Sequence, residues 1–224
     1  AKIVEYNSSL DVVVQFENGE IGKFQTVALK KGYFRNPSIP SVFDIGYPGG
    51  HVPLSDKNTY YRSWKSMLER CYTDFRNNCY VGCSVDPVWH NYQNFKKWYI
   101  ASARGKSGKL EIDKDLIVPN NKVYGPDFCE LIPREMNQSL KKGNPANKKE
   151  GCNTGVYLEN GKYRAIISKL NIGTFDTNKE AFAEYCRHKT ALIRKLAEEY
   201  KDVLSERAYN AASNYDFKNY EEEV

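Results

Sequence analysis

The sequence is poor in histidine and methionine and has no long apolar run. Only three His and two Met occur among the 224 residues. No stretch approaches the roughly 18 consecutive apolar residues that a membrane-spanning helix requires. The first residues, Ala1 to Glu5, also lack the apolar core of a signal peptide. The sequence therefore predicts a soluble protein of the cytoplasm with no membrane partner.

Several motifs of well-known protein classes are missing as well. Gly105-Lys106-Ser107 lacks the upstream glycine and strand of a nucleotide-binding phosphate loop. No Gly-x-Ser-x-Gly turn, which exposes a nucleophilic serine, is present, and no internal repeat is visible. These absences exclude phosphate-loop nucleotidases, serine hydrolases with that turn, and repeat proteins.

The six cysteines do not form a recognisable zinc motif. Cys79 and Cys83 are separated by three residues, which is not a usual structural zinc spacing, and no His pair accompanies them. Disulfides are typical of secreted proteins, and nothing here indicates secretion. We therefore expect buried reduced thiols and no structural zinc.

Charge is distributed unevenly along a chain whose formal net charge is only +5. Residues 138–172 carry seven Lys and Arg against two acidic residues, whereas residues 198–224 carry three basic against eight acidic residues. A basic central stretch suits an anionic partner such as nucleic acid. The same distribution is compatible with an ordinary solvated surface, so charge alone leaves both interpretations open.

Hydrophobic patterning predicts an α+β protein built from small units. The expected order is given by ranges: 1–50, a small β unit and linker; 59–137, a central α+β domain; 138–154, a basic linker; 155–204, a sheet-plus-helix domain; 205–224, an acidic tail with a frayed or partly docked end. In the first unit, Asn18-Gly19 predicts a hairpin turn, because these residues readily adopt positive φ.

The segment after residue 155 gives the clearest local signals. Asn160-Gly161 separates two short β-rich runs and predicts a hairpin, and a third run follows at 171–175. Thr177 and Glu180 have the spacing of a capping box at the start of a long amphipathic helix. Alternation along 162–168 places Arg164, Ile166 and Ser168 on one side and Tyr163, Ala165 and Ile167 on the other.

This segment resembles the Apetala-two (ethylene-response-factor) DNA-binding domain. The resemblance rests on Gly155-Val156, Lys162-Tyr163-Arg164-Ala165-Ile166, Ile172-Gly173-Thr174-Phe175-Asp176-Thr177, Lys179-Glu180-Ala181 and Tyr185. It implies that the three-stranded sheet enters the major groove of double-stranded DNA while the helix packs behind it. Tyr157 and Glu159 stand where basic residues are common in that family, so its base preference does not transfer.

The candidate DNA-binding residues follow from this resemblance and from the basic linker. On the sheet they are Tyr157, Lys162, Tyr163, Arg164, Ser168 and Lys169. In the linker they are Lys141, Lys142, Lys148 and Lys149, which would contact phosphates and become ordered on binding. The alternative for the linker lysines is a solvated, flexible segment.

The central stretch, 60–137, is similar to phage-encoded HNH-type proteins of the homing-endonuclease kind that carry the same DNA-binding module. The matching text is Tyr61-x2-Trp64-x2-Met67-Leu68-x-Arg70-Cys71-Tyr72, Val85-x3-Trp89-x5-Phe95-x2-Trp98, Ile112-Asp113-Lys114-Asp115, Asn121-Lys122-x-Tyr124-x-Pro126-x2-Cys129 and Asn137. The resemblance implies a DNA endonuclease, a hydrolase that uses magnesium or another divalent cation.

The sequence departs from the HNH pattern at the catalytic base. HNH nucleases need a His at the end of the first strand, where it activates the water that attacks the phosphate. Lys114 occupies this place, and a lysine of ordinary pKa is protonated at neutral pH. His51, His90 and His188 all lie outside the expected strand–loop–helix.

Three interpretations of the Asp113-Lys114-Asp115 run stay open. A carboxylate-based metal site, with Asp113, Asp115 and Asn121 as ligands and Lys114 and Asn137 nearby, would still cut or nick DNA. Alternatively, the fold has lost its chemistry and serves as a DNA clamp. The run is also compatible with a surface ion-pair cluster of little energetic weight.

Three functions correspond to these observations. The missing His favours a sequence-reading protein that binds double-stranded DNA without cutting it. The HNH resemblance favours a metal-dependent endonuclease or nickase, so whether the chain is an enzyme is undecided. An inhibitor or regulator that binds another protein through aromatic side chains is the third, although no sequence feature indicates a protein partner.

Overall fold

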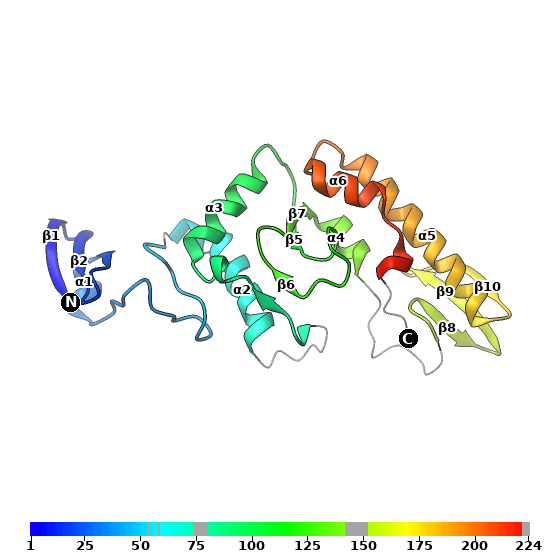
Figure 1. Cartoon of the computed structure of the whole chain (residues 1–224), viewed down its shortest axis with the longest axis horizontal. Helices are drawn as coiled ribbons and strands as arrows, with labels where there is room; N and C mark the ends of the chain where they lie inside the picture. Colours follow the sequence, from blue (N-terminus) through cyan, green and yellow to red (C-terminus); the bar gives the residue numbers. More distant parts are fainter. Residues whose placement is uncertain (53, 58, 74–79, 142–151, 221–224) are drawn as a thin grey trace. The chain divides into compact units, whose positions relative to one another are not determined.

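The computed structural model describes residues 1–52, 54–57, 59–73, 80–141 and 152–220. It contains both helices and several small sheets, so the predicted α+β class is confirmed (Figure 1). The chain divides into two compact units. The first unit comprises Ala1–Ser102 and Lys122–Asp127, and the second comprises Ala103–Asn121 and Phe128–Val224.

The first unit begins with a three-stranded antiparallel sheet. Its strands, in the order β1-β2-β3, are β1 (Lys2–Ser8), β2 (Asp11–Gln15) and β3 (Ile21–Phe24), and the short helix α1 (Thr26–Lys30) follows. The predicted turn is present, with Gly19 at φ 85° and the Phe16 N–H bonded to the Glu20 carbonyl at 2.8 Å. Because β2 is central, its three valines are buried, whereas β1 is exposed along its whole length.

The rest of the first unit is built on two amphipathic helices. Its elements are η1 (Leu54–Asp56), α2 (Tyr60–Tyr72), β4 (Ser84–Val85), η3 (Pro87–Trp89), α3 (Tyr92–Ala103) and β6 (Val123–Tyr124), which pairs with β4 in parallel. The side chains of Trp64, Met67, Leu68, Trp89 and Phe95 form a buried core, as their helical spacing predicts.

The described residues of the second unit form a strand pair, a three-stranded sheet and three α-helices. Its elements are β5 (Leu110–Asp113), β7 (Glu130–Pro133), α4 (Arg134–Leu140), β8 (Val156–Glu159), β9 (Lys162–Ile167), β10 (Leu170–Phe175), α5 (Asn178–Glu199), α6 (Glu206–Ser213) and η5 (Phe217–Tyr220). Strands β5 and β7 are antiparallel, and α4 follows β7 directly.

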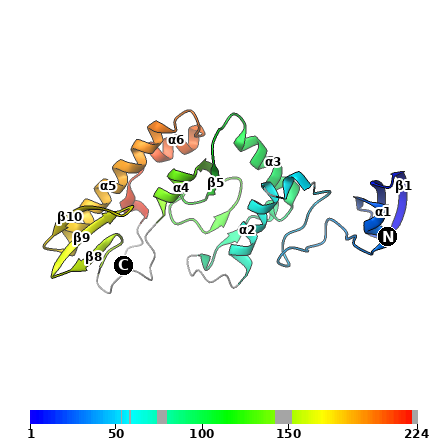
Figure 2. The ribbon, with the colours of Figure 1, turned by 180° about the vertical axis from the view of Figure 1, so that it is seen from behind.

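Helix α5 runs along one side of the β8–β9–β10 sheet, as Figures 1 and 2 both show. Strand β9 is central and antiparallel to both neighbours. Asn160 and Gly161 have φ values of 50° and 74° in the predicted hairpin turn. The predicted capping box is also present, because the Thr177 hydroxyl accepts a bond from the Glu180 N–H and the Glu180 carboxylate accepts one from the Thr177 N–H.

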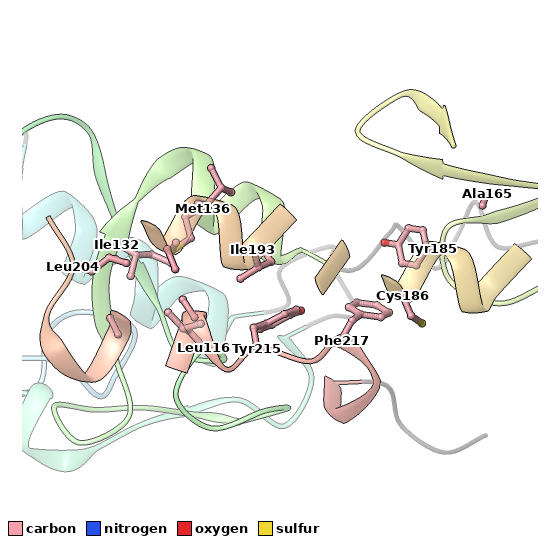
Figure 3. Close-up of a cluster of buried hydrophobic side chains, with 14 of the residues drawn as sticks. Leu116, Ile132, Met136, Ala165, Tyr185, Cys186, Ile193, Leu204, Tyr215 and Phe217 are labelled. Carbon is pink, nitrogen blue, oxygen red and sulfur yellow. The ribbon is translucent and has the colours of Figure 1, made fainter. Parts of the chain in front are cut away.

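One hydrophobic core joins this sheet and helix to the β5–β7–α4 segment (Figure 3). Leu116, Ile132 and Met136 from the predicted central domain belong to the same cluster as Ala165 of β9 and Ile193 of α5. Packing therefore divides the chain near residues 102 and 128, and the predicted boundary at 138–154 lies inside the second unit. The physical reason is that α4 is too short to bury its own apolar face and contacts α5.

The acidic segment after residue 204 is packed rather than frayed as far as the described chain extends. Ala208 and Ala212 are buried in the core of the second unit. Tyr215 and Phe217 are buried in the same core (Figure 3). The Arg194 guanidinium donates to the Tyr215 carbonyl at 2.9 Å, and the Phe217 N–H donates to the Thr190 hydroxyl at 3.1 Å. Of the two predicted alternatives, a frayed or a partly docked end, these residues have the docked one, because their apolar side chains are buried in the core.

Candidate nucleic-acid interface

Among the described residues, helix α5 packs against one face of the sheet of the second unit, and we call the other face the open face. Tyr163, Ala165 and Ile167 of β9 contact the core, as the alternation predicts. Their neighbours Lys162, Arg164 and Ile166 therefore lie on the open face. Register adds Tyr157, opposite Arg164 on β8, and Thr174, opposite Arg164 on β10. A cation on the central strand is thus flanked by a tyrosine and a threonine.

Both cations of β9 on the open face are paired with carboxylates. The Arg164 guanidinium donates from Nη1 to Glu159, and the Lys162 ammonium donates to Asp176. Side chains on this face therefore have little net charge. In the sequence, Glu159 stands out only because basic residues are common at its place in Apetala-two domains. Its ion pair with Arg164 depends on the register of β8 and β9, which the two-residue hairpin turn fixes.

Two candidate DNA-binding residues are not on the open face: the alternation already placed Tyr163 on the other face, and Ser168 lies in a turn. Tyr163 faces α5 and packs partly against the core, so it is not on the open face. Ser168 does not continue the alternation of β9, because Ser168 and Lys169 form the β9–β10 turn with φ values of 48° and 73°. Lys169 therefore lies at the tip of a hairpin rather than on a strand.

Of the four linker lysines, the structure describes one. Lys141 is exposed at the C-terminus of α4, and its carbonyl accepts a bond from the Lys189 ammonium at 3.1 Å. Lys142, Lys148 and Lys149 lie outside the described residues. The predicted phosphate contacts of these lysines stay predictions.

The Asp113 carboxylate closes the turn that follows β5. Its Oδ1 accepts hydrogen bonds from the backbone N–H groups of Asp115, at 3.0 Å, and Leu116, at 2.6 Å. Burial raises the pKa of Asp113 to about 6, although the bond from the Leu116 N–H acts in the opposite direction. A carboxylate that caps two backbone donors has a structural role in this loop.

Lys114 and Asn121 close the same loop from its other side. The Lys114 ammonium donates to the Asp115 carboxylate at 2.7 Å and to the Asn121 carbonyl at 2.5 Å. The Asn121 amide returns a bond to the Lys114 carbonyl at 3.0 Å. Lys114 directly follows β5, where the HNH resemblance expects the base, but its side chain is used to bind this loop together.

Asn137 of α4 interacts with a carboxylate of β5. Its amide donates to the Glu111 carboxylate at 2.7 Å, and the Arg134 guanidinium lies 3.4 Å from the same carboxyl group. Glu111 and Asp113 share one side of β5, two residues apart. The contacts bring Asn137 to Glu111, a residue that the sequence analysis did not select because only the β5–α4 packing identifies it.

The residues of this loop do not fit a divalent metal site. One oxygen of Asp113 is occupied by two backbone donors, and Asp115 is neutralised by Lys114. Within the described part of the chain, no group of three or more His, Cys, Asp or Glu side chains could hold a metal ion. The carboxylates that the sequence analysis proposed as ligands are therefore engaged in holding the turn.

The three histidines are spread over other elements. His51 is exposed in a loop, and the His90 Nε2 lies 3.0 Å from the Val85 carbonyl in the first unit. The His188 Nε2 lies 3.0 Å from the Glu184 carboxylate on α5.

None of the helices in the described residues is long and apolar enough to cross a membrane.

Comparisons with known proteins add no relative. No protein-family model, no curated protein and no solved structure matches the chain.

Proposed function

We propose that the chain binds double-stranded DNA in a sequence-dependent way through the open face of β8, β9 and β10. The observation that carries this proposal is the place of Arg164. It lies on the central strand of a small sheet that α5 supports from behind, and its side chain is 35% exposed. A small β-sheet fits the major groove, and an arginine can donate two hydrogen bonds to guanine.

The composition of this face suits base reading better than strong phosphate binding. Tyr157 and Thr174 beside Arg164 offer hydroxyl and ring contacts. The carboxylates of Glu159 and Asp176 reduce the attraction to phosphates, which supplies most of non-specific affinity. Further phosphate contacts would come from cations around the face, among them Lys169 at the hairpin tip.

Selection from a pool of random duplexes tests this proposal. The purified chain is mixed with the pool at moderate salt, bound duplexes are recovered and amplified, and the cycle is repeated. Enrichment of one short motif, bound more tightly than a scrambled duplex, is the expected result. Recovery of no motif, together with no measurable binding of any duplex at low salt, would contradict DNA binding.

We propose further that this chain binds DNA without cutting it. The loop contacts of Asp113, Lys114 and Asp115 support this view, because they use these side chains to hold a turn. The test incubates supercoiled plasmid with the chain and magnesium or manganese, and with a chelator as control. Metal-dependent nicking that is lost in the Asp113→Asn variant would replace this proposal with the endonuclease that the HNH resemblance implies.

A further inference from the structure

The ion pair of Glu159 on the open face does not join residues that stand directly opposite each other on β8 and β9. Glu159 stands directly opposite Lys162 in the β8–β9 register, and cross-strand neighbours of opposite charge usually interact. Instead, Glu159 contacts Arg164, its diagonal neighbour, while Lys162 contacts Asp176 beyond the end of β10. The Glu159 carboxylate on β8 therefore binds Arg164 of the central strand rather than Lys162.

This contact leaves a defined part of the guanidinium available. One terminal nitrogen, Nη1, donates to Glu159, and Nε is shielded from solvent without a hydrogen-bond partner. Among the described residues, Nη2 has no hydrogen-bond partner. An arginine needs two N–H groups to bind the O6 and N7 atoms of guanine, and its terminal nitrogens still offer them.

We propose that Glu159 is a positioning residue that reserves Arg164 for a base edge and keeps it off the phosphate backbone. This inference rests on the proposed DNA-binding function. A tethered guanidinium loses less conformational entropy when it meets its target. At the same time, the carboxylate beside it is repelled by phosphates, so Arg164 gains little from non-specific duplex. Both effects increase the ratio of specific to non-specific affinity.

The Glu159→Gln variant separates these effects from those of charge in general. Without the carboxylate, Arg164 can move to a phosphate. Affinity for scrambled duplex should rise. Its dependence on salt should also become steeper, because one further phosphate contact changes the slope of log affinity against log salt concentration by about 0.9. Preference for the base pair that Arg164 contacts should fall by about fivefold or more.

The Asp176→Asn variant is the matched control. It removes the same charge from the same sheet, but its partner is Lys162 rather than Arg164. Glu159 and Asp176 are 52% and 75% exposed, so both variants should fold, and their thermal unfolding checks this. Asp176→Asn should raise affinity for selected and scrambled duplexes alike and leave the base preference unchanged.

The experiment measures affinity for the selected duplex, its single-base variants and a scrambled duplex over a series of salt concentrations. The expected result is a loss of base preference at one position in Glu159→Gln that Asp176→Asn does not share. In the Arg164→Ala background, Glu159→Gln should no longer change that preference, because Glu159 acts through Arg164.

Three results would overturn the proposal. Equal behaviour of Glu159→Gln and Asp176→Asn would reduce Glu159 to a general charge effect. A base preference that still responds to Glu159→Gln in the Arg164→Ala background would show that Glu159 acts independently. In both cases the unaltered chain still binds duplex, so DNA binding stands. Failure of the unaltered chain to bind any duplex would instead remove the proposed function itself.

Discussion

At the scale of single residues, the Asp113 carboxylate shows how one residue type serves different purposes. The sequence suggested a metal ligand, because two aspartates flank Lys114 next to a strand end. In the structure, Asp113 is buried and accepts two backbone N–H bonds, which is the role of aspartate in a tight turn. Sequence pattern cannot separate these roles, because both need a carboxylate directly after a strand.

Replacing Asp113 tests the turn role. Asp113→Ala leaves the buried Leu116 N–H and the partly buried Asp115 N–H without this acceptor and should lower the free energy of unfolding by about 1–3 kcal/mol. Asp113→Asn keeps an oxygen that accepts both bonds and removes the buried charge, so it should be much less destabilising. Urea unfolding of the two variants measures the difference. Equal losses of stability would show that the negative charge, rather than the acceptor, is needed.

Lys189 is a second buried ionisable group, and its contacts lie within the second unit. The ammonium donates to the Lys141 carbonyl and lies 5.8 Å from the centre of the Phe217 ring. Burial lowers the pKa of Lys189 from 10.5 to about 8. Below pH 8 the lysine is charged in both folded and unfolded chains, so the full cost of burying the charge is present. Between pH 8 and 10.5 only the unfolded chain keeps the proton, and stability should rise with pH.

The Lys189→Met variant should therefore be more stable than the unaltered chain at pH 7, by up to about 3 kcal/mol. Its stability should also lose the rise between pH 8 and 10.5 that Lys189 contributes. Urea unfolding at pH 7 and pH 9.5 checks both expectations. A destabilised variant at pH 7 would mean that the bond to Lys141 and the contact with Phe217 outweigh the cost of burial.

At the scale of elements, Gly155 fixes how β8 meets α5. It has a φ of 73°, and a Cβ added there would lie 2.0 Å from the Tyr185 ring. Gly161 in the hairpin turn has nearly the same φ, 74°, but nothing lies within 4 Å of its Cβ position. The two glycines therefore share a left-handed backbone conformation, which a residue with a Cβ would adopt with strain, and they differ in packing.

The Gly155→Ala and Gly161→Ala variants separate the two contributions. Gly161→Ala should lower the free energy of unfolding by about 1–2 kcal/mol through backbone strain. Gly155→Ala should add about 1–3 kcal/mol, because the Tyr185 ring must move out of a packed core. Thermal unfolding of both variants measures the difference. Equal losses would contradict the close approach of β8 to α5.

The sequence predicted correctly those turns, caps and strands whose formation depends on residues close together in the chain. The Asn18-Gly19 and Asn160-Gly161 turns, the Thr177–Glu180 capping box and the alternation of β9 are all present. Strand β1 was not predicted, because it is an exposed strand with no apolar alternation. The ion pairs of the open face were missed because they depend on register and on side-chain direction, which composition does not contain.

At the scale of the whole chain, the shared core of the second unit was the least predictable feature. Leu116, Ile132 and Met136 lie within the range predicted as the central domain, yet they pack with residues of α5 and α6. Such contacts join segments far apart along the chain and leave no local pattern. For the same reason, the sequence left open whether the acidic tail is frayed or docked.

Removing the residues after 204 tests this core. The truncation exposes the sites filled by Tyr215 and Phe217, each of which contributes about 1.5–3 kcal/mol when buried. It also removes Ser205 and Arg207, which bind the buried Glu130 carboxylate at 2.9 and 2.8 Å. The truncated chain should be destabilised by several kcal/mol in urea unfolding. Unchanged unfolding after the truncation would show that the residues after 204 are dispensable for stability.

Reading of duplex DNA by the open face of the second unit is the central claim, and Arg164 tests it most directly. The measurement is the affinity of the unaltered chain and of Arg164→Ala for the selected duplex and for a scrambled duplex of equal length. The variant should lose about 1–3 kcal/mol, or about 5- to 150-fold, on the selected duplex and little on the scrambled one. Unchanged affinity for the selected duplex would contradict the placement of the DNA-reading face.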